Sequence, residues 1–150
     1  MANPDIWKLR AEFKGPHDLI TTSDGETIFL RRWEPVSKSK TTFLIFHGIT
    51  AYSGPYGRIL ADELAKSGFT VCGMDLRGHG LSGGRRGDYP NADRLRMDLC
   101  ETITFGKSKS TNLLVLGHSL GALSAIIAMN HCPKGIDGLV LVSAQVWPRP

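Results

Sequence analysis

Long apolar runs are missing from this 150-residue sequence, and other absences narrow its class further. No eighteen consecutive residues are apolar, so we expect no transmembrane helix. The first residues lack the basic-then-apolar layout of a signal peptide. Aromatic residues make up only 8% of the chain and the basic residues are scattered, which argues against a nucleic-acid-binding surface. There is no internal repeat and no low-complexity segment.

Cysteine is scarce as well. The three cysteines are Cys72, Cys100 and Cys132, an odd number at wide spacing. Such a set is typical of buried thiols in a reducing compartment rather than of a disulfide or zinc framework. We therefore expect no disulfide, no metal site and a cytoplasmic location.

The sequence does contain enough apolar residues for one hydrophobic core. Hydrophobic residues make up 41% of the chain and charged residues 21%, values typical of a globular domain. A domain of about 150 residues buries roughly 68–70% of the surface of its unfolded chain. We predict an irregular segment over residues 1–16 and one domain over residues 17–150.

Short apolar runs alternate with helical patterns along the predicted domain. The Asp24-Gly25 pair is a strong turn signal and predicts a hairpin over residues 20–33. Continuous apolar runs predict strands that are buried on both faces, and apolar residues spaced four apart predict helices between them. The predicted strands are 42–46, 69–74, 113–116 and 138–142, and the predicted helices are 56–66, 92–105 and 120–130. This order predicts an α/β fold with a mostly parallel sheet and an N-terminal hairpin.

Two of these predicted elements are apolar on more than one face. The helix over 120–130 is apolar nearly all round, so we expect it to be buried. The strand over 138–142 has no later strand in the sequence with which to pair. Because an uncovered apolar edge strand promotes aggregation, we expect more of the same chain, a partner or a second copy to cover it.

The most informative motif is Gly117-His118-Ser119-Leu120-Gly121. It follows a predicted strand and directly precedes a predicted helix, which is the context of a G-x-S-x-G nucleophile elbow. A turn this tight has room only for glycine on either side, at Gly117 and Gly121. The following helix directs the positive end of its dipole at the reacting centre. The motif predicts acyl transfer through Ser119.

Two backbone N–H groups form the predicted oxyanion hole. One is the N–H of Leu120, directly after the nucleophile. The other is the N–H of Ile49, since Gly48 after His47 lets the backbone turn sharply at the end of an earlier strand. Each such donor stabilises the transition state by about 3–4 kcal/mol. The alternative is that His47-Gly48 forms an ordinary turn at the end of the strand.

The other histidines and acidic residues are weaker candidates. Asp75 and His79 lie on a Gly-rich loop, where hydrogen bonds that hold the turn are favoured over a catalytic pair or a metal site. We expect His118 to pack behind the elbow. The helix rise places His131 about 16 Å or more from Ser119, too far for a base. Nothing in the pattern favours a catalytic role for His17, which precedes the first hairpin strand. We expect Asp137, which precedes the last strand, at the end of the sheet opposite the predicted site.

Together these motifs resemble the α/β-hydrolase superfamily. Within it they are similar to the branch of monoacylglycerol lipases, lysophospholipase-like esterases and serine aminopeptidase-type hydrolases. The resemblance covers about residues 18–145 and is carried by His47-Gly48, 53–56, 75–82 and 117–121. The sequence departs from the pattern of monoacylglycerol lipases at Thr50-Ala51-Tyr52, where those enzymes usually carry a small residue, Gly, Glu and His.

The resemblance implies a serine hydrolase of carboxylic esters, such as monoacylglycerols or lysophospholipids, that needs no cofactor. It also implies the chain order serine, acid, histidine, and no good candidate for the acid or the histidine follows Ser119 here. We therefore expect an N-terminal half that lacks the last strands and ends where the cap of the family begins. A C-terminal half or a second copy would cover residues 138–142. The alternatives are an inactive hydrolase fragment, an interaction module that uses this last strand, or hydrolysis of an amide, thioester or C–C bond.

Overall fold

The computed structural model describes residues 5–144. The strands are β1 (His17–Thr21), β2 (Thr27–Trp33), β3 (Thr41–Phe46), β4 (Thr70–Asp75), β5 (Asn112–His118) and β6 (Gly138–Val142). The helices are α1 (Ile6–Glu12), α2 (Asp62–Lys66), α3 (Ala92–Lys109) and α4 (Leu120–His131), with a π-helical turn at Gly57–Ala61 and a 3-10 turn at Pro133–Gly135. Every strand and helix predicted between residues 20 and 142 is present, with ends that differ by a few residues.

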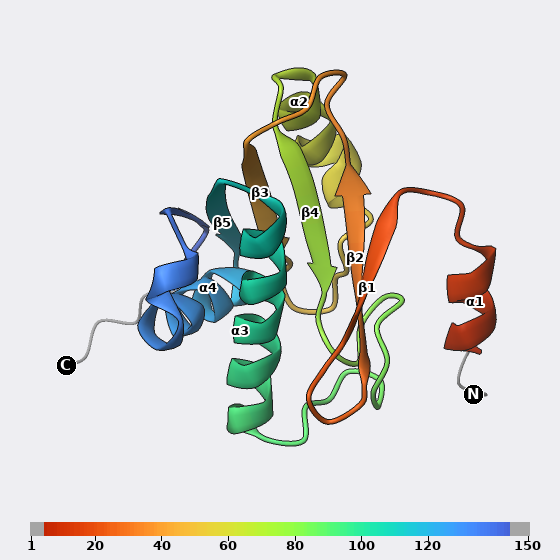
Figure 1. Cartoon of the computed structure of the whole chain (residues 1–150). Helices are drawn as coiled ribbons and strands as arrows, with labels where there is room; N and C mark the ends of the chain where they lie inside the picture. The colour runs from red at the N-terminus through yellow and green to blue at the C-terminus, as the bar shows by residue number, and fades with distance from the viewer. Residues whose placement is uncertain (1–4, 145–150) are drawn as a thin grey trace.

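The strands form one six-stranded sheet in the order β1-β2-β4-β3-β5-β6. β2 is antiparallel to both β1 and β4, whereas the other neighbouring strands are parallel. Helices α3 and α4 pack on one face of the sheet and α2 packs on the other (Figure 1). The arrangement confirms the predicted α/β fold class with its N-terminal hairpin.

The core is divided between the two faces of the sheet. Alternate residues of a strand point to opposite faces, so Leu44 and Phe46 of β3 pack toward α3 and α4 while Ile45 packs toward α2. All three side chains are buried. Since β3, β4 and β5 are parallel and lie side by side, their carboxyl ends meet at one edge of the sheet, where ligands bind in open α/β sheets.

The prediction of an irregular segment over residues 1–16 is wrong for α1. Asp5 caps this helix, because its side chain accepts a hydrogen bond from the Lys8 N–H at 3.1 Å. Arg10 anchors the helix through a 2.8 Å hydrogen bond from Nε to the Leu81 carbonyl. Seven residues are too few to show an apolar period, so only the cap could have indicated a helix. A domain boundary at residue 17 stays a prediction.

The hairpin also has a longer loop than predicted. The strands end at Thr21 and resume at Thr27, and the Thr22 N–H donates to the Glu26 carbonyl at 2.9 Å. Within this loop, Gly25 has a φ of 84°, a conformation that glycine adopts without steric cost. The Asp24-Gly25 signal therefore marks the turn correctly but not its length.

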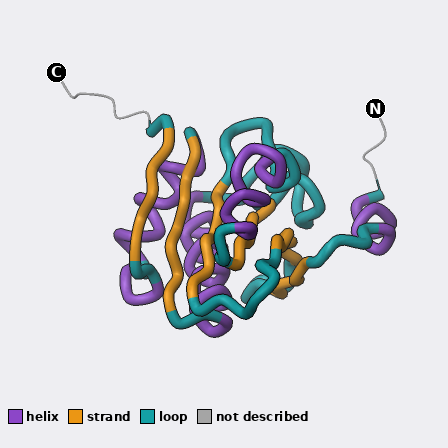
Figure 2. Tube along the Cα trace, turned by 90° about the horizontal axis from the view of Figure 1, so that it is seen from above, coloured by secondary structure: helices purple, strands orange, loops and turns teal. Residues whose placement is uncertain are grey.

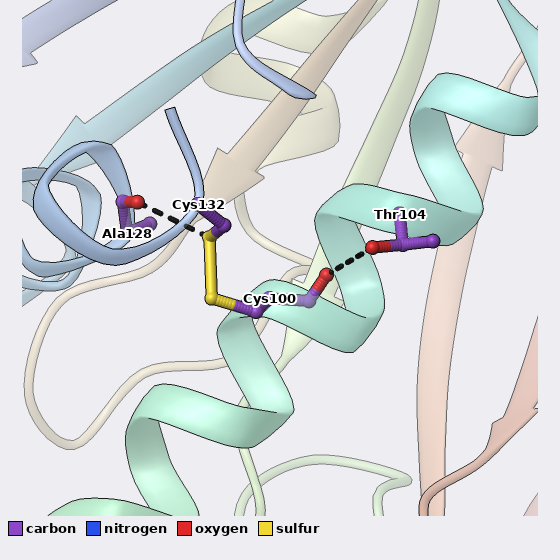
Figure 3. Close-up of a disulfide and its surroundings, with 4 residues drawn as sticks. All are labelled: Cys100, Thr104, Ala128 and Cys132. Atoms are coloured by element: carbon purple, nitrogen blue, oxygen red, sulfur yellow. Dashed lines mark hydrogen bonds between the residues drawn. A yellow bond between two sulfur atoms is a disulfide. The ribbon is translucent and has the colours of Figure 1, made fainter. Parts of the chain in front are cut away.

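A disulfide joins Cys100 of α3 to Cys132 just after α4 (Figure 3). The expectation of three free thiols is therefore wrong. The two residues are 32 positions apart, but their Cα atoms lie 5.7 Å apart because α3 and α4 pack side by side. Cys72 is a free thiol whose pKa is raised to about 12 by burial. The cytoplasmic location, which depended on free thiols, stays a prediction.

Helix α4 and strand β6 expose much of their apolar surface. The small residues of α4 face the sheet, whereas Leu123 is 53% exposed and Ile126 is 42% exposed. The prediction that this helix is buried all round is therefore wrong, because no layer of residues 5–144 covers its outer side. β6 forms the edge of the sheet opposite β1 (Figure 2) and pairs with β5 alone among the described strands. Among these residues, no helix is long and apolar enough to cross a bilayer.

Candidate active site

Ser119 lies at the sharp turn between β5 and α4, with φ 55° and ψ −116°. A positive φ is uncommon for a residue other than glycine and persists only where the surroundings hold it. Here the Ser119 N–H donates to the Val142 carbonyl at 3.0 Å, and the Ser119 carbonyl accepts the Ala122 N–H at 2.9 Å. The turn is thus held by hydrogen bonds from both β6 and α4.

The two glycines of the motif are required by close backbone approach. A Cβ atom at Gly117 would collide with the backbone of Gly121, the second residue of α4. A Cβ atom at Gly121 would collide with the backbone of Phe46 at the end of β3. Glycine at these positions therefore lets α4 begin directly against the sheet.

The loop after β3 lies against the elbow. A Cβ atom at Gly48 would stand 3.4 Å from Ser119 Cβ and 3.3 Å from His118 Nδ1. The next residue, Ile49, has a side chain that is 68% exposed, and its N–H donates to no group among residues 5–144. The segments that carry the two predicted oxyanion donors, Ile49 and Leu120, are thus neighbours.

His47 fastens the start of this loop to the end of β4. Its Nδ1 lies 2.8 Å from the Gly48 carbonyl and its Nε2 lies 3.0 Å from the Leu76 N. A carbonyl only accepts and a backbone N–H only donates, so Nδ1 carries the proton and Nε2 accepts. Burial lowers the pKa of His47, which keeps the ring neutral. His47 is therefore a structural tie between the two loops.

Asp75, at the end of β4, also holds neighbouring loops in place. Its fully buried carboxylate accepts the Ser53 N–H at 2.6 Å and the Leu81 N–H at 2.8 Å. His79 donates from Nδ1 to the Arg77 carbonyl at 3.0 Å. The two residues hold their loops, as expected, and do not bond to each other. No group of three or more His, Cys, Asp or Glu residues between 5 and 144 is placed to hold a metal ion.

A buried ion network holds the Gly-rich loop against α3. Arg77 binds Asp98 through two hydrogen bonds of 2.8 and 3.0 Å and also binds Asp24 at 2.9 Å. Arg94 joins Asp98 at 2.8 Å. The hydrogen bonds to Asp98 raise the pKa of Arg77, and the hydrogen bond from Arg77 lowers the pKa of Asp24. This network could not be predicted from the sequence, because Asp24 and Arg77 lie far in the chain from Arg94 and Asp98 on α3.

The contacts of Tyr56 could not be predicted from the sequence either, although residues 53–56 carry part of the resemblance. Its hydroxyl oxygen lies 3.1 Å from the Gly48 N and 2.8 Å from His118 Nδ1. His118 therefore packs behind the elbow, as expected, and does so against a specific partner. No sequence signal relates Tyr56 to a histidine 62 positions later.

No described histidine or acid forms a hydrogen bond with the Ser119 side chain. Asp137 instead binds the Leu113 N–H at 2.7 Å and Lys107 at 2.5 Å. His17 stacks on Phe29 with ring centroids 5.1 Å apart. Within residues 5–144, the hydrogen bonds thus assemble the elbow and the loop beside it without a catalytic base or acid.

Comparison with known proteins agrees with this geometry. Residues 37–150 match the family described as serine aminopeptidase, S33. The monoglyceride lipase of Homo sapiens is 31% identical over 137 residues, which are 90% of this chain and 44% of the lipase. The chain therefore spans less than half the length of that relative.

Two solved structures share the fold over nearly all of the chain. A hydrolase from Pseudomonas aeruginosa PA01 has a TM-score of 0.74 and 26% identity, over 92% of this chain and 49% of that one. The esterase Pf2001 of Pyrococcus furiosus has a TM-score of 0.68 and 28% identity, over 91% of this chain and 53% of that one. The chain belongs to the serine aminopeptidase S33 family of α/β-hydrolases, in the branch that contains the monoglyceride lipases.

Proposed function

We propose that this chain carries the nucleophile of a serine hydrolase and that Ser119 attacks the carbonyl carbon of a carboxylic ester. One observation supports this most directly. Ser119 has φ 55° on a strand–turn–helix elbow, and the Gly48 backbone lies against its side chain. This geometry exposes a nucleophile beside backbone donors, which is how α/β-hydrolases build their sites.

The proposed reaction is acyl transfer in two steps. Ser119 Oγ bonds to the carbonyl carbon, the serine proton passes to a histidine base, and the carbonyl oxygen becomes an oxyanion. The N–H groups of Ile49 and Leu120 bind this oxyanion. When the carbonyl re-forms, the bond to the alcohol breaks and the alcohol takes the proton from the histidine. Water then releases the acid from Ser119 by the same steps, and neither a metal nor a cofactor takes part.

The base and its orienting acid are proposed to come from a complementary C-terminal half of the polypeptide. The human relative is more than twice as long as the matched region. β6 offers an edge for further strands, with Val140, Leu141 and Val142 each about 40% exposed. The same exposed edge supports the alternative function, an interaction module or inactive fragment that pairs through β6.

The proposed substrates are esters with an apolar acyl group, of the monoacylglycerol or lysophospholipid kind. The relatives named monoglyceride lipase and esterase support an ester substrate. The exposed side chains of Ile49 and Leu120 flank the proposed oxyanion hole and supply apolar surface. Hydrolysis of an amide or a thioester is the alternative, since the elbow serves all three bonds.

Ester hydrolysis by the protein as it is naturally produced tests the proposal. We expect p-nitrophenyl butyrate to be hydrolysed and a fluorophosphonate probe to label Ser119, as read by peptide mass spectrometry. Ser119→Ala should abolish both signals. Ser108→Ala is the matched control, because this exposed serine hydrogen-bonds only the Phe105 carbonyl among described residues, on α3. Equal hydrolysis by wild type and Ser119→Ala would reject the proposal.

A further inference from the structure

We infer that Tyr56 is a positioning residue that fixes the oxyanion loop, residues 47–51, relative to the elbow, residues 117–121. The inference rests on the proposed role of Ser119. Tyr56 precedes the π-helical turn, and the residue is only 7% exposed. Its hydroxyl lies between the two segments, 3.1 Å from the Gly48 N and 2.8 Å from His118 Nδ1.

The directions of these two hydrogen bonds follow from the groups present. The Gly48 N–H only donates, so the Tyr56 oxygen accepts from it. If His118 Nδ1 also donated, the hydroxyl proton would have no acceptor among the described residues, which is costly in a buried site. The Tyr56 O–H therefore donates to His118 Nδ1, and the His118 ring carries its proton on Nε2.

Each partner of the hydroxyl is next to a reacting group. Gly48 directly precedes Ile49, whose N–H is the proposed first oxyanion donor. His118 directly precedes Ser119, and the second proposed donor follows at Leu120. One hydroxyl thus sets the distance between the segments that carry the nucleophile and both donors, without itself touching a substrate.

Other ties hold the oxyanion loop, but to a different part of the fold. His47 fastens the start of the loop to the end of β4, and Asp75 at the end of β4 binds the Ser53 N–H just after the loop. Among residues 5–144, the hydrogen bonds between residues 47–56 and the elbow pass through the Tyr56 hydroxyl. Removal of this hydroxyl should therefore leave the loop folded while it loosens the placement of the loop beside Ser119.

This role makes a specific kinetic prediction for Tyr56→Phe. Transition-state contacts depend on placement more strongly than substrate binding does. We expect kcat for p-nitrophenyl butyrate to fall about 10- to 100-fold, while KM changes less than about twofold. Tyr52→Phe is the matched control, because Tyr52 directly follows this loop and its hydroxyl forms no hydrogen bond with residues 5–144. This variant should leave both constants unchanged.

Two measurements separate this role from general destabilisation. Hydrogen exchange of the Gly48 amide should become faster in Tyr56→Phe and stay unchanged in Tyr52→Phe. In the unmodified protein, long-range ¹H–¹⁵N correlation should show His118 protonated on Nε2 with Nδ1 as an acceptor. The second measurement needs no variant, so it stays decisive even if Tyr56→Phe does not fold.

The outcomes distinguish this inference from the proposed function. An unchanged kcat in Tyr56→Phe, in a protein whose hydrolysis is abolished by Ser119→Ala, overturns the positioning role and leaves the proposed function standing. A proton on Nδ1 of His118 also overturns the assigned bridge. If the wild type shows no Ser119-dependent hydrolysis, the proposed function is rejected and the role of Tyr56 in it is rejected as well.

Discussion

Ser119 occupies a backbone conformation that strains every residue except glycine. Its φ of 55° and ψ of −116° belong to the sparsely populated conformations that cost about 1–3 kcal/mol and occur at functional sites. We expect Ser119→Gly to be more stable than Ser119→Ala by about 1 kcal/mol, because both variants lose the hydroxyl and only glycine relieves the strain. Urea denaturation of the two variants checks this, and equal midpoints would contradict it.

His47 gives the fold a dependence on pH. Burial lowers its pKa from the ordinary value of 6.5, so the unfolded chain binds the proton more readily than the folded one does. Stability is therefore highest above about pH 6.5 and falls as the pH drops toward the lowered pKa. Asp75 and His79 face the ring and partly offset each other, since Asp75 raises its pKa and His79 lowers it.

Thermal melts between pH 7.5 and 5 measure this dependence. We expect the drop in Tm on acidification to be smaller in His47→Asn than in the wild type, although the variant starts from a lower Tm. His131→Asn removes an exposed histidine at the far end of α4 and should keep the dependence of the wild type. The same drop in His47→Asn would mean that another group is responsible.

The sequence predicted the roles that depend on adjacent residues better than those that depend on contacts across the fold. Elbow glycines and a strand-to-helix turn are local, so Gly117 and Gly121 could be explained before the structure was known. The ties made by His47, Asp75 and Tyr56 depend on which loops meet at the carboxyl ends of the strands. Their spacing in the chain contains no such information.

At the scale of elements, α3 is the support to which the first hairpin, the Gly-rich loop and α4 are attached. Asp98 of α3 is fully buried between Arg77 and Arg94. Removal of one partner from a buried ion pair leaves an uncompensated charge. We expect Asp98→Ala to lower the free energy of unfolding by about 3–5 kcal/mol, as measured by urea denaturation. Lys66→Ala breaks an exposed pair with Glu63 and should have little effect.

The Cys100–Cys132 disulfide is the second attachment, between α3 and the end of α4. Closing a loop of 32 residues removes chain entropy worth about 3–4 kcal/mol from the unfolded state. We expect the double variant Cys100→Ser, Cys132→Ser to lose about that much stability and to be insensitive to dithiothreitol. A Cys72→Ala control should keep the sensitivity. Three free thiols in the denatured, unreduced protein would contradict the disulfide.

The elements were predicted well where the sequence pattern was long. Helix α3 has an apolar stripe of several turns, and the Asn91 side chain caps it by accepting the Arg94 N–H at 2.8 Å. Helix α1 is too short for a stripe and was missed. The burial of α4 was predicted wrongly because an apolar sequence shows what a helix can bury, not which layers are present to cover it.

At the scale of the whole molecule, the edge of the sheet formed by β6 leaves apolar side chains exposed to solvent. β6 exposes the side chains of Val140, Leu141 and Val142, and among residues 5–144 no strand pairs with its outer edge. We expect the 150-residue chain on its own to associate as its concentration rises, as seen by sedimentation velocity. Val140→Lys should weaken this association, whereas Val36→Lys, which changes an exposed valine away from the edge, should not. A chain that remains monomeric in all three forms would contradict this.

The hydrogen bond from the Ser119 N–H to the Val142 carbonyl connects that edge to the candidate active site. A strand that adds to β6 would order the same backbone whose Val142 carbonyl accepts the N–H of the proposed nucleophile. Addition of a strand to β6 would then change the reactivity of Ser119, so that hydrolysis would report on assembly, as in a split-enzyme reporter. Fusing the two halves of such a hydrolase to separate bait proteins would turn contact between the baits into a signal that accumulates with every turnover.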